Sequence, residues 1–450
     1  MGRSSNRQSR FCGFRRPRFA RLEVRKQRLR TETPARRRPR PGRSYEGAQA
    51  PSCIPRVPNW VFDSLGAVLK GRLLFRGGRM LDHTSLNQII VDLMMVFMVL
   101  GALDFCLGGR FGLGAQFERG LQTMGPLALS MVGIVSLAPV LGEVLSPIVG
   151  PIYSALGADP AMFATTLLAC DMGGYSLAQS MAQSQEAADF AGILLGCTMG
   201  CTLVFTIPVA LGIIDKADRP YLAKGTLCGW VCLPVGCLAG GAVAGYSFSM
   251  MVKNLTPILL VAALVAVGLV AFPSAMIRGF EIFGKGIVVL GALSLMLVIL
   301  EQLCGVVIIP GMAPASEGIL TVGNIAMMLA GAYPLVSVLT RLCGKPLAAL
   351  GKILRMNGSA VAGLIASLAS SLPMFAMMKD MDERGKVMNA AFTVCGAYVL
   401  GGHLGFTAGV ARHMIVPMLV GKLVGGLLAV ALAAWMTRKH TQHGTSENAL

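Results

Sequence analysis

The chain has 450 residues, of which 54% are hydrophobic and only 14% are charged, and its formal net charge is +18. Soluble domains usually carry about 25% charged residues, so this composition argues against an ordinary cytosolic enzyme. The charge is confined to one end, because residues 1–80 hold 21 of the 40 Lys and Arg but only 4 of the 22 Asp and Glu. The rest of the chain is nearly neutral, so we expect no nucleic-acid partner for it.

Residues 1–79 form a basic extension without the apolar run of a secretory signal. The Arg- and Pro-rich run at 36–40 cannot bury apolar surface, so we predict that the extension is disordered. A start assigned too far upstream, with the true start near Met80, explains it most simply; an arm for nucleic acid or acidic lipid is the alternative. We expect a polytopic membrane domain at 80–440 and a short polar tail at 441–450.

The remainder of the chain is dominated by eleven apolar segments, each long enough to cross about 30 Å of hydrocarbon, which takes about 20 residues. Only helices satisfy their own backbone hydrogen bonds in lipid, so the predicted fold class is an all-α integral membrane protein. In chain order the segments are 86–107, 124–150, 159–182, 188–214, 222–252, 255–272, 286–310, 319–340, 356–378, 387–410 and 413–437.

The charges of the connecting loops indicate that two segments do not cross. Lys and Arg in short loops mark the cytoplasmic side, and eleven complete crossings would put basic loops on both sides. All basic loops share a side if 159–182 and 356–378 enter and return as re-entrant hairpins, which leaves about nine transmembrane helices. Both segments are interrupted where a hairpin tip would lie, by Asp171-Met172-Gly173-Gly174 and by Ser370-Ser371-Leu372-Pro373.

The order span, hairpin, span, span occurs at 124–252 and again at 319–437. The two copies would start on opposite sides of the membrane, so we predict an inverted-topology repeat, a plan that binds substrate near the bilayer midplane. The sequences match only weakly, at an offset of 199. A competing offset of 165 aligns Asp215 with Asp380, but only the first agrees with the loop charges.

The twelve cysteines are expected to pack as small buried apolar residues. Most lie inside apolar segments, and Cys228, Cys232 and Cys237 have no His or carboxylate with which to complete a metal shell. We therefore predict no disulfide framework, no metal and no cofactor.

Ionisable residues inside the apolar segments are candidate site residues, because a charge at the bilayer centre costs about 2.5–3.5 kcal/mol on insertion scales. Those we take as candidates are Asp92, Asp104, Glu143, Asp171, Glu301 and His403. Asp92, Asp104 and Glu301 lie nearer the segment ends, where the interface is the simpler assignment. Asp171, at the first hairpin tip, is the strongest candidate, with a helix cap as its alternative role.

Six stretches resemble the ethanolamine permease family of ethanolamine-utilisation operons, over about residues 86–437. They are LGADPAMF (156–163), LLACDMGG (167–174), IPVALGII (207–214), PMF (373–375), RGKV (384–387) and HLGF (403–406). The resemblance implies a multi-pass protein of the bacterial inner membrane that takes up ethanolamine. Two positions depart from the family pattern: Gly402 replaces a common acidic residue, and Ser370-Ser371 replaces a common Asn-Asn pair.

An ethanolammonium site needs one carboxylate, several neutral acceptors and an aromatic face for the cation. The expected substrate-binding residues are Asp171, Gly173, Gly174, Tyr175, Ser370, Ser371, His403 and Glu143. The two serines would bond the ammonium or the hydroxyl, and His403 would bond the hydroxyl or carry a proton. Each of these residues also has a structural alternative. The serine hydroxyls would bond to carbonyls of the preceding helical turn, His403 would pack in the core, and Glu143 would pair with a residue across the bundle.

The leading hypothesis is uptake of ethanolamine by a facilitator or secondary transporter that binds its substrate between the two hairpins. Another small amine or alcohol is the alternative substrate, and an intramembrane enzyme or a membrane scaffold is the alternative class. An enzyme is disfavoured because HExxH, GxSxG and paired intramembrane carboxylates at helical spacing are absent from the sequence. Partners beyond substrate and lipid bilayer stay open, a homo-oligomer included.

Overall fold

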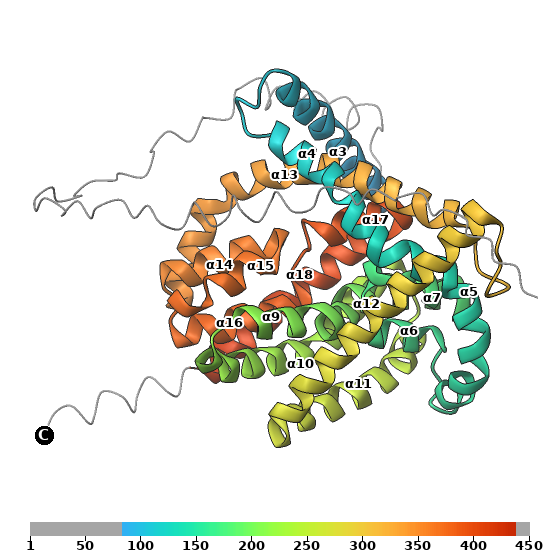
Figure 1. The fold of residues 1–450 in the computed structure, drawn as a ribbon. Helices are drawn as coiled ribbons and strands as arrows, with labels where there is room; N and C mark the ends of the chain where they lie inside the picture. The colour runs from blue at the N-terminus through green and yellow to red at the C-terminus, as the bar shows by residue number, and fades with distance from the viewer. Residues whose placement is uncertain (1–82, 438–450) are drawn as a thin grey trace, which may run out of the picture. The chain divides into compact units, whose positions relative to one another are not determined.

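The computed structural model describes residues 83–437, and this part of the chain is built from helices with no strand (Figure 1). The predictions for the extension 1–79 and the tail 441–450 lie outside the described residues. Eight described segments are long and apolar enough to cross a membrane, so the chain is an all-α, multi-pass membrane protein. They are Leu86–Cys106, Gly114–Ala155, Gln185–Ile213, Lys216–Ala244, Phe248–Val265, Ile282–Cys304, Ala315–Leu342 and Arg412–Met436.

Long helices alternate with groups of short ones. The long helices are α3 (His83–Cys106), α5 (Met124–Ala155), α10 (Arg219–Ala244), α11 (Phe248–Ala271), α12 (Pro273–Cys304), α13 (Ala315–Leu354) and α18 (Ile415–Met436). The short α-helices are α4 (Gly114–Gln122), α6 (Ala161–Leu167), α7 (Gly174–Met181), α8 (Gln185–Asp189), α9 (Ile207–Ile213), α14 (Gly358–Ala369), α15 (Ser371–Ala376), α16 (Glu383–Cys395) and α17 (Gly402–Val410). The described part also contains two π-helices, η2 (Phe190–Gly200) and η3 (Thr202–Thr206), and four 3-10 turns, η1 (Cys170–Met172), η4 (Lys216–Asp218), η5 (Met378–Asp380) and η6 (Arg412–Met414).

The first predicted hairpin has its two ends together. Asp159 precedes α6, and its Oδ1 accepts a hydrogen bond from the backbone N–H of Ala161 at 2.9 Å. Its Oδ2 accepts from the backbone N–H of Gln183, just after α7, at 2.9 Å. The chain therefore reverses direction between residues 159 and 183, as expected of a hairpin.

The second predicted hairpin is closed in the same way. Asn357 Oδ1 accepts from the backbone N–H of Ala360 at 2.9 Å, which caps α14. The Asn357 side chain donates to the carbonyl of Asp380 at 2.9 Å, and its backbone N–H donates to Asp382 Oδ1 at 2.9 Å. In both hairpins, the polar residue that precedes the first short helix, Asp159 before α6 or Asn357 before α14, thus also binds the returning chain.

Two predicted spans are interrupted. The segment 222–252 is divided because Gly245, with φ +83°, ends α10, and the Ser247 hydroxyl then accepts from the backbone N–H of Met250 at 3.3 Å to start α11. The segment 387–410 is divided between α16 and α17, so the described part has eight candidate spans where about nine were predicted. Residues 396–401 leave the helix because their backbone finds partners in the second hairpin, as described below.

The centre of the described part is packed backbone against backbone. A Cβ on Gly236 of α10 would lie 2.7 Å from the carbonyl oxygen of Gly421 on α18, and a Cβ on Gly421 would lie 2.9 Å from that of Gly236. Only glycine allows this approach, which is typical of helix pairs in membranes. Gln185–Ile213, which contains both π-helices, is the most deeply buried of the eight candidate spans.

Candidate functional site

The first hairpin tip is a tight turn around one carbonyl. The carbonyl of Ala169 accepts from the backbone N–H of Met172 at 3.1 Å and from that of Gly174 at 3.0 Å. Gly173 has φ +86°, and a Cβ there would overlap the side chain of Ile134 on α5. The two glycines are therefore required by the shape of the tip, and that shape presents Asp171 within η1.

Asp171 is half-buried and lies near three groups of other elements. It is close enough for its charge to interact with the ammonium of Lys422 on α18 and with the hydroxyls of Tyr333 and Tyr398. Lys422 is 2% exposed and donates to the carbonyl of Cys197 at 2.6 Å. The site therefore has a buried cation within electrostatic range of its carboxylate, and the sequence analysis missed it, although a lysine within 413–437 was a visible signal.

The second hairpin tip is joined to the linker between α16 and α17. The backbone N–H groups of Tyr398 and Leu400 each donate at 2.9 Å, to the carbonyls of Ser367 and Leu368 at the end of α14. The hydroxyls of Ser371 and Tyr398 lie 2.5 Å apart. Ser370 caps α15 through a 3.4 Å bond from the backbone N–H of Leu372. Tyr398 thus contacts the second tip through both its backbone and its hydroxyl.

Aromatic rings surround this junction. The Tyr398 ring lies 6.0 Å from that of Phe205, at 77°, and 5.3 Å from the imidazole of His403. Tyr175, in the first turn of α7, meets Phe406 of α17 edge-on at 5.9 Å. His403 is 2% exposed, and its Nδ1 has no hydrogen-bond partner among the described residues. Of the predicted site residues, the structure thus gathers those of both tips, Tyr175 and His403.

Glu143 is not brought to this junction. It is exposed on α5, nine residues beyond Ile134, which packs against the first tip. Nine residues of α-helix extend about 13 Å, so the carboxylate lies well along α5 from Asp171.

Asp104 has a structural role. It is 3% exposed and accepts hydrogen bonds from the backbone N–H groups of Phe111, Leu113 and Gly114 at 2.8–3.0 Å. These bonds hold the turn between α3 and α4, where backbone groups would otherwise lack partners.

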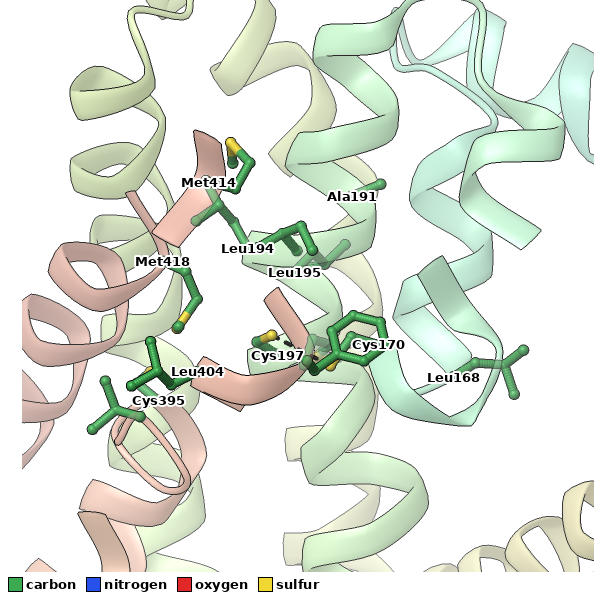
Figure 2. Packing of buried hydrophobic residues seen from close by; sticks show 14 of the residues in the cluster. Leu168, Cys170, Ala191, Leu194, Leu195, Cys197, Cys395, Leu404, Met414 and Met418 are labelled. Atoms are coloured by element: carbon green, nitrogen blue, oxygen red, sulfur yellow. Dashed lines mark hydrogen bonds between the residues drawn. The ribbon is translucent and has the colours of Figure 1, made fainter. Parts of the chain in front are cut away.

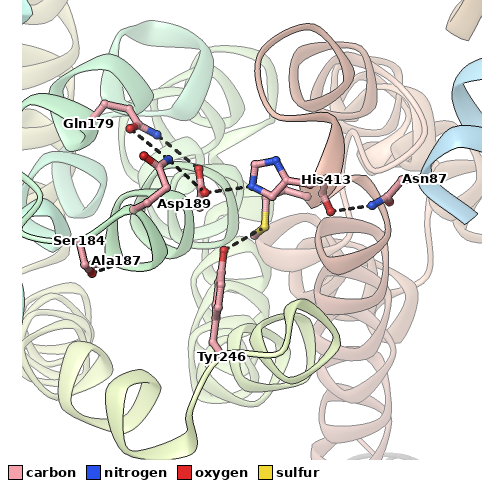
Figure 3. Close-up of polar contacts among 9 residues, drawn as sticks. Asn87, Gln179, Ser184, Ala187, Asp189, Tyr246 and His413 are labelled. Carbon is pink, nitrogen blue, oxygen red and sulfur yellow. Dashed lines mark hydrogen bonds and ion pairs between the residues drawn. The ribbon is translucent and has the colours of Figure 1, made fainter. Parts of the chain in front are cut away.

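A second polar cluster lies at one end of α7 (Figure 3). Asp189, 2% exposed, accepts from Gln179 at 3.3 Å and from Gln185 at 3.2 Å, and it pairs with His413 Nε2 at 3.0 Å. The nearby Tyr246 hydroxyl contacts Met414 Sδ at 3.3 Å, and burial, followed by the charge of Asp189, raises the pKa of Tyr246. The cluster joins the first hairpin to the start of α18.

A further ion pair joins the start of α10 to α16. Lys386 Nζ lies 2.6 Å from Asp218 Oδ1, and the side chains are 13% and 4% exposed. The same ammonium lies 5.5 Å from the centre of the Tyr221 ring. This pair and the Asp189 pair were not predicted, because the partners lie 168 and 224 positions apart in the sequence.

Comparisons with known proteins agree with the resemblance seen in the sequence. The family model "Ethanolamine utilisation protein, EutH" matches residues 86–436. The "Probable ethanolamine permease EutH" of Listeria monocytogenes serotype 1/2a (strain 10403S) is 60% identical over 355 residues, which are 79% of this chain and 95% of the relative. The protein of the same name in Escherichia coli (strain K12) is 46% identical over 403 residues, 81% of this chain and 99% of the relative. "Uncharacterized protein YxeR" of Bacillus subtilis (strain 168) is 51% identical over 353 residues, 78% and 95% of the two chains. No solved structure matches the chain.

Proposed function

Because the chain belongs to the EutH family of ethanolamine utilisation proteins, we propose that it carries ethanolamine across the bacterial inner membrane. It is a transporter and not an enzyme. The substrate binds as ethanolammonium between the tips of the two hairpins. Asp171 accepts the ammonium group, and the hydroxyls of Ser371 and Tyr398 bond the substrate hydroxyl.

One observation carries this proposal: Tyr398 connects the two tips. Its hydroxyl lies 2.5 Å from that of Ser371 at the second tip, and its ring lies 5.3 Å from the imidazole of His403, which meets Cys170 of the first tip. We therefore expect one substrate to reach the carboxylate of Asp171, the two hydroxyls and an aromatic ring where two helices are broken. These are the groups that a small amino alcohol requires, since its two ends differ in charge but both form hydrogen bonds.

Lys422 adjusts how tightly the cation is held. Its ammonium partly neutralises Asp171 when the site is empty, and it is anchored by its 2.6 Å bond to the carbonyl of Cys197. An entering ethanolammonium competes with Lys422 for the carboxylate, so the net gain on binding is modest. A transporter needs such a site, because its substrate has to leave as well as enter.

The order of short elements supports alternating access around the two hairpins. Each hairpin starts at a capping residue, Asp159 or Asn357, that also binds the returning chain. Each is followed by an interrupted helix, a three-residue 3-10 turn and a long final helix, α10 or α18. We extend this to an inverted repeat in which the halves rock about a central site.

A different small amine or alcohol is the second candidate substrate. Gly402 and the Ser370-Ser371 pair depart from the pattern expected of an ethanolamine permease, and both lie at the second tip or beside His403. Serine hydroxyls are shorter than asparagine amides, so they leave more room around the substrate. Ethylamine, choline and ethylene glycol as competitors separate the contributions of charge, size and hydroxyl.

The test is uptake of labelled ethanolamine into proteoliposomes under imposed pH and Na⁺ gradients. We expect wild-type protein and Glu143→Gln to transport, and Asp171→Asn to lose most of its uptake. Glu143→Gln is the matched control, because it neutralises an exposed carboxylate of the same membrane domain. No uptake by correctly inserted wild-type protein would refute transport, and full uptake by Asp171→Asn would refute the site.

A further inference from the structure

Three buried side chains that lie far apart in the sequence meet beside Asp171. Cys170 lies in η1, Cys197 in η2 and His403 in α17, and they are 0%, 1% and 2% exposed. Their ligand atoms, two sulfurs and a ring nitrogen, lie within 4.8 Å of one another. The two sulfurs are 3.3 Å apart, and Figure 2 shows this contact between the first hairpin tip and the π-helix.

The separations are close to those of a metal site. Tetrahedral coordination with metal–sulfur bonds of about 2.3 Å places two sulfurs about 3.8 Å apart, and a nitrogen ligand about 3.5 Å from each sulfur. The observed cluster needs only small side-chain rotations to reach these distances. Two thiolates and an imidazole form a donor set that selects soft or borderline cations over Na⁺, Mg²⁺ or Ca²⁺.

His403 supplies an independent observation. Its imidazole is buried, and Nδ1 has no hydrogen-bond partner within residues 83–437. Buried polar groups are nearly always satisfied, so an orphaned ring nitrogen beside two thiols points to a ligand.

We propose that Cys170, Cys197 and His403 form a binding site for a divalent cation of the zinc and cadmium class. The incoming M²⁺ displaces one proton from each thiol, so the product is M(S–Cys)₂(His) with two protons released. The complex is electrically neutral, which avoids the large cost of burying a bare ion. Three protein ligands leave a fourth position open to water.

A bound cation affects transport, and this part rests on the proposed function. The three ligands come from the first hairpin tip, the π-helix and the half-helix after the Tyr398 linker. A metal would tie together elements that have to separate during alternating access. We therefore expect Cd²⁺ or Zn²⁺ to inhibit ethanolamine uptake reversibly, with recovery on chelation.

The binding test uses Cd²⁺ as the probe and the reduced, full-length protein in detergent. Titration is followed by the ultraviolet charge-transfer band of cadmium thiolates and by proton release, with two protons expected for each ion. Cys170→Ser and Cys197→Ser should each weaken binding at least tenfold, and His403→Gln should weaken it several-fold. Cys395→Ser is the matched control, since Cys395 is also fully buried but lies outside the cluster.

A second measurement covers variants that fail to fold. Wild-type protein is alkylated with and without Cd²⁺, and the modified cysteines are mapped by mass spectrometry. Protection of Cys170 and Cys197 but not of Cys395 supports the site. Equal alkylation, or a charge-transfer band unchanged in both serine variants, would overturn it. Binding is read independently of uptake, so an inactive transporter that still binds Cd²⁺ separates failure of the proposed function from failure of the site.

Discussion

Replacing Lys422 by Met tests the charge balance of the site most directly. The substitution keeps the length of the side chain but removes the cation that interacts with Asp171. Breaking a buried ion pair in direct contact costs about 3–5 kcal/mol, because the other charge is left uncompensated. Lys422 and Asp171 interact at longer range than such a pair, so this figure is an upper bound. Asp171 is only half-buried, so water screens part of its charge. We therefore take about a third of this cost, ~1–1.5 kcal/mol, as the free energy lost when Lys422 is replaced.

An entering ethanolammonium would relieve that cost. We therefore expect Lys422→Met to lower the KM for ethanolamine about tenfold, since 1.4 kcal/mol corresponds to a factor of ten. The maximal rate should fall, because a more tightly held substrate leaves more slowly. The loss of the bond to the Cys197 carbonyl should also lower thermal stability by about 1–3 kcal/mol.

The assay is uptake of labelled ethanolamine by wild type, Lys422→Met, Asp171→Asn and the double variant in proteoliposomes. If Lys422 acts through the carboxylate, the KM effect of Lys422→Met disappears in the Asp171→Asn background. Lys386→Met is the control, because Lys386 pairs with Asp218 and not with the site. An unchanged or raised KM in Lys422→Met, or the same effect with and without Asp171, would refute this reasoning.

Three further predictions concern the tips and the polar cluster. Gly173→Ala should destabilise the protein by about 2–4 kcal/mol in thermal unfolding, because a positive φ and an overlap with α5 add together; an unchanged melting temperature would contradict the tip geometry. Tyr398→Phe removes one hydrogen bond to Ser371 but keeps the ring, so kcat/KM for uptake should fall about 2–10-fold, and an unaltered value would exclude the hydroxyl from binding. Asp189→Asn should destabilise the protein by about 1–3 kcal/mol in thermal unfolding, because it weakens the contacts of a buried carboxylate with Gln179, Gln185 and His413; an unchanged melting temperature would argue against the polar cluster.

The two hairpins could be predicted because the signals for them are short sequence interruptions and the distribution of Lys and Arg among the loops. Interruptions at Asp171 and Ser370 are visible in the sequence, and loop charges accumulate over the whole chain. We did not single out Asp159 or Asn357 from the sequence, although each accepts a hydrogen bond from a backbone N–H at the start of the helix that follows it. The continuous helix expected at 387–410 is instead divided, and the cause is not local. The backbone N–H groups of Tyr398 and Leu400 donate to carbonyls at the end of α14 and not to carbonyls of their own helix, and no local sequence pattern indicates this.

The sequence by itself determined the class of the protein, since lipid leaves a long apolar chain with few folds other than a helical bundle. It also determined the positions of both helix breaks. Only the tertiary structure decided which partners the buried charged groups have. The ammonium of Lys422 donates to a carbonyl 225 positions earlier, and the carboxylate of Asp189 contacts a histidine 224 positions later. Such pairs depend on distances between distant segments, because a charge buried in an apolar interior is stable only where folding has placed its partner.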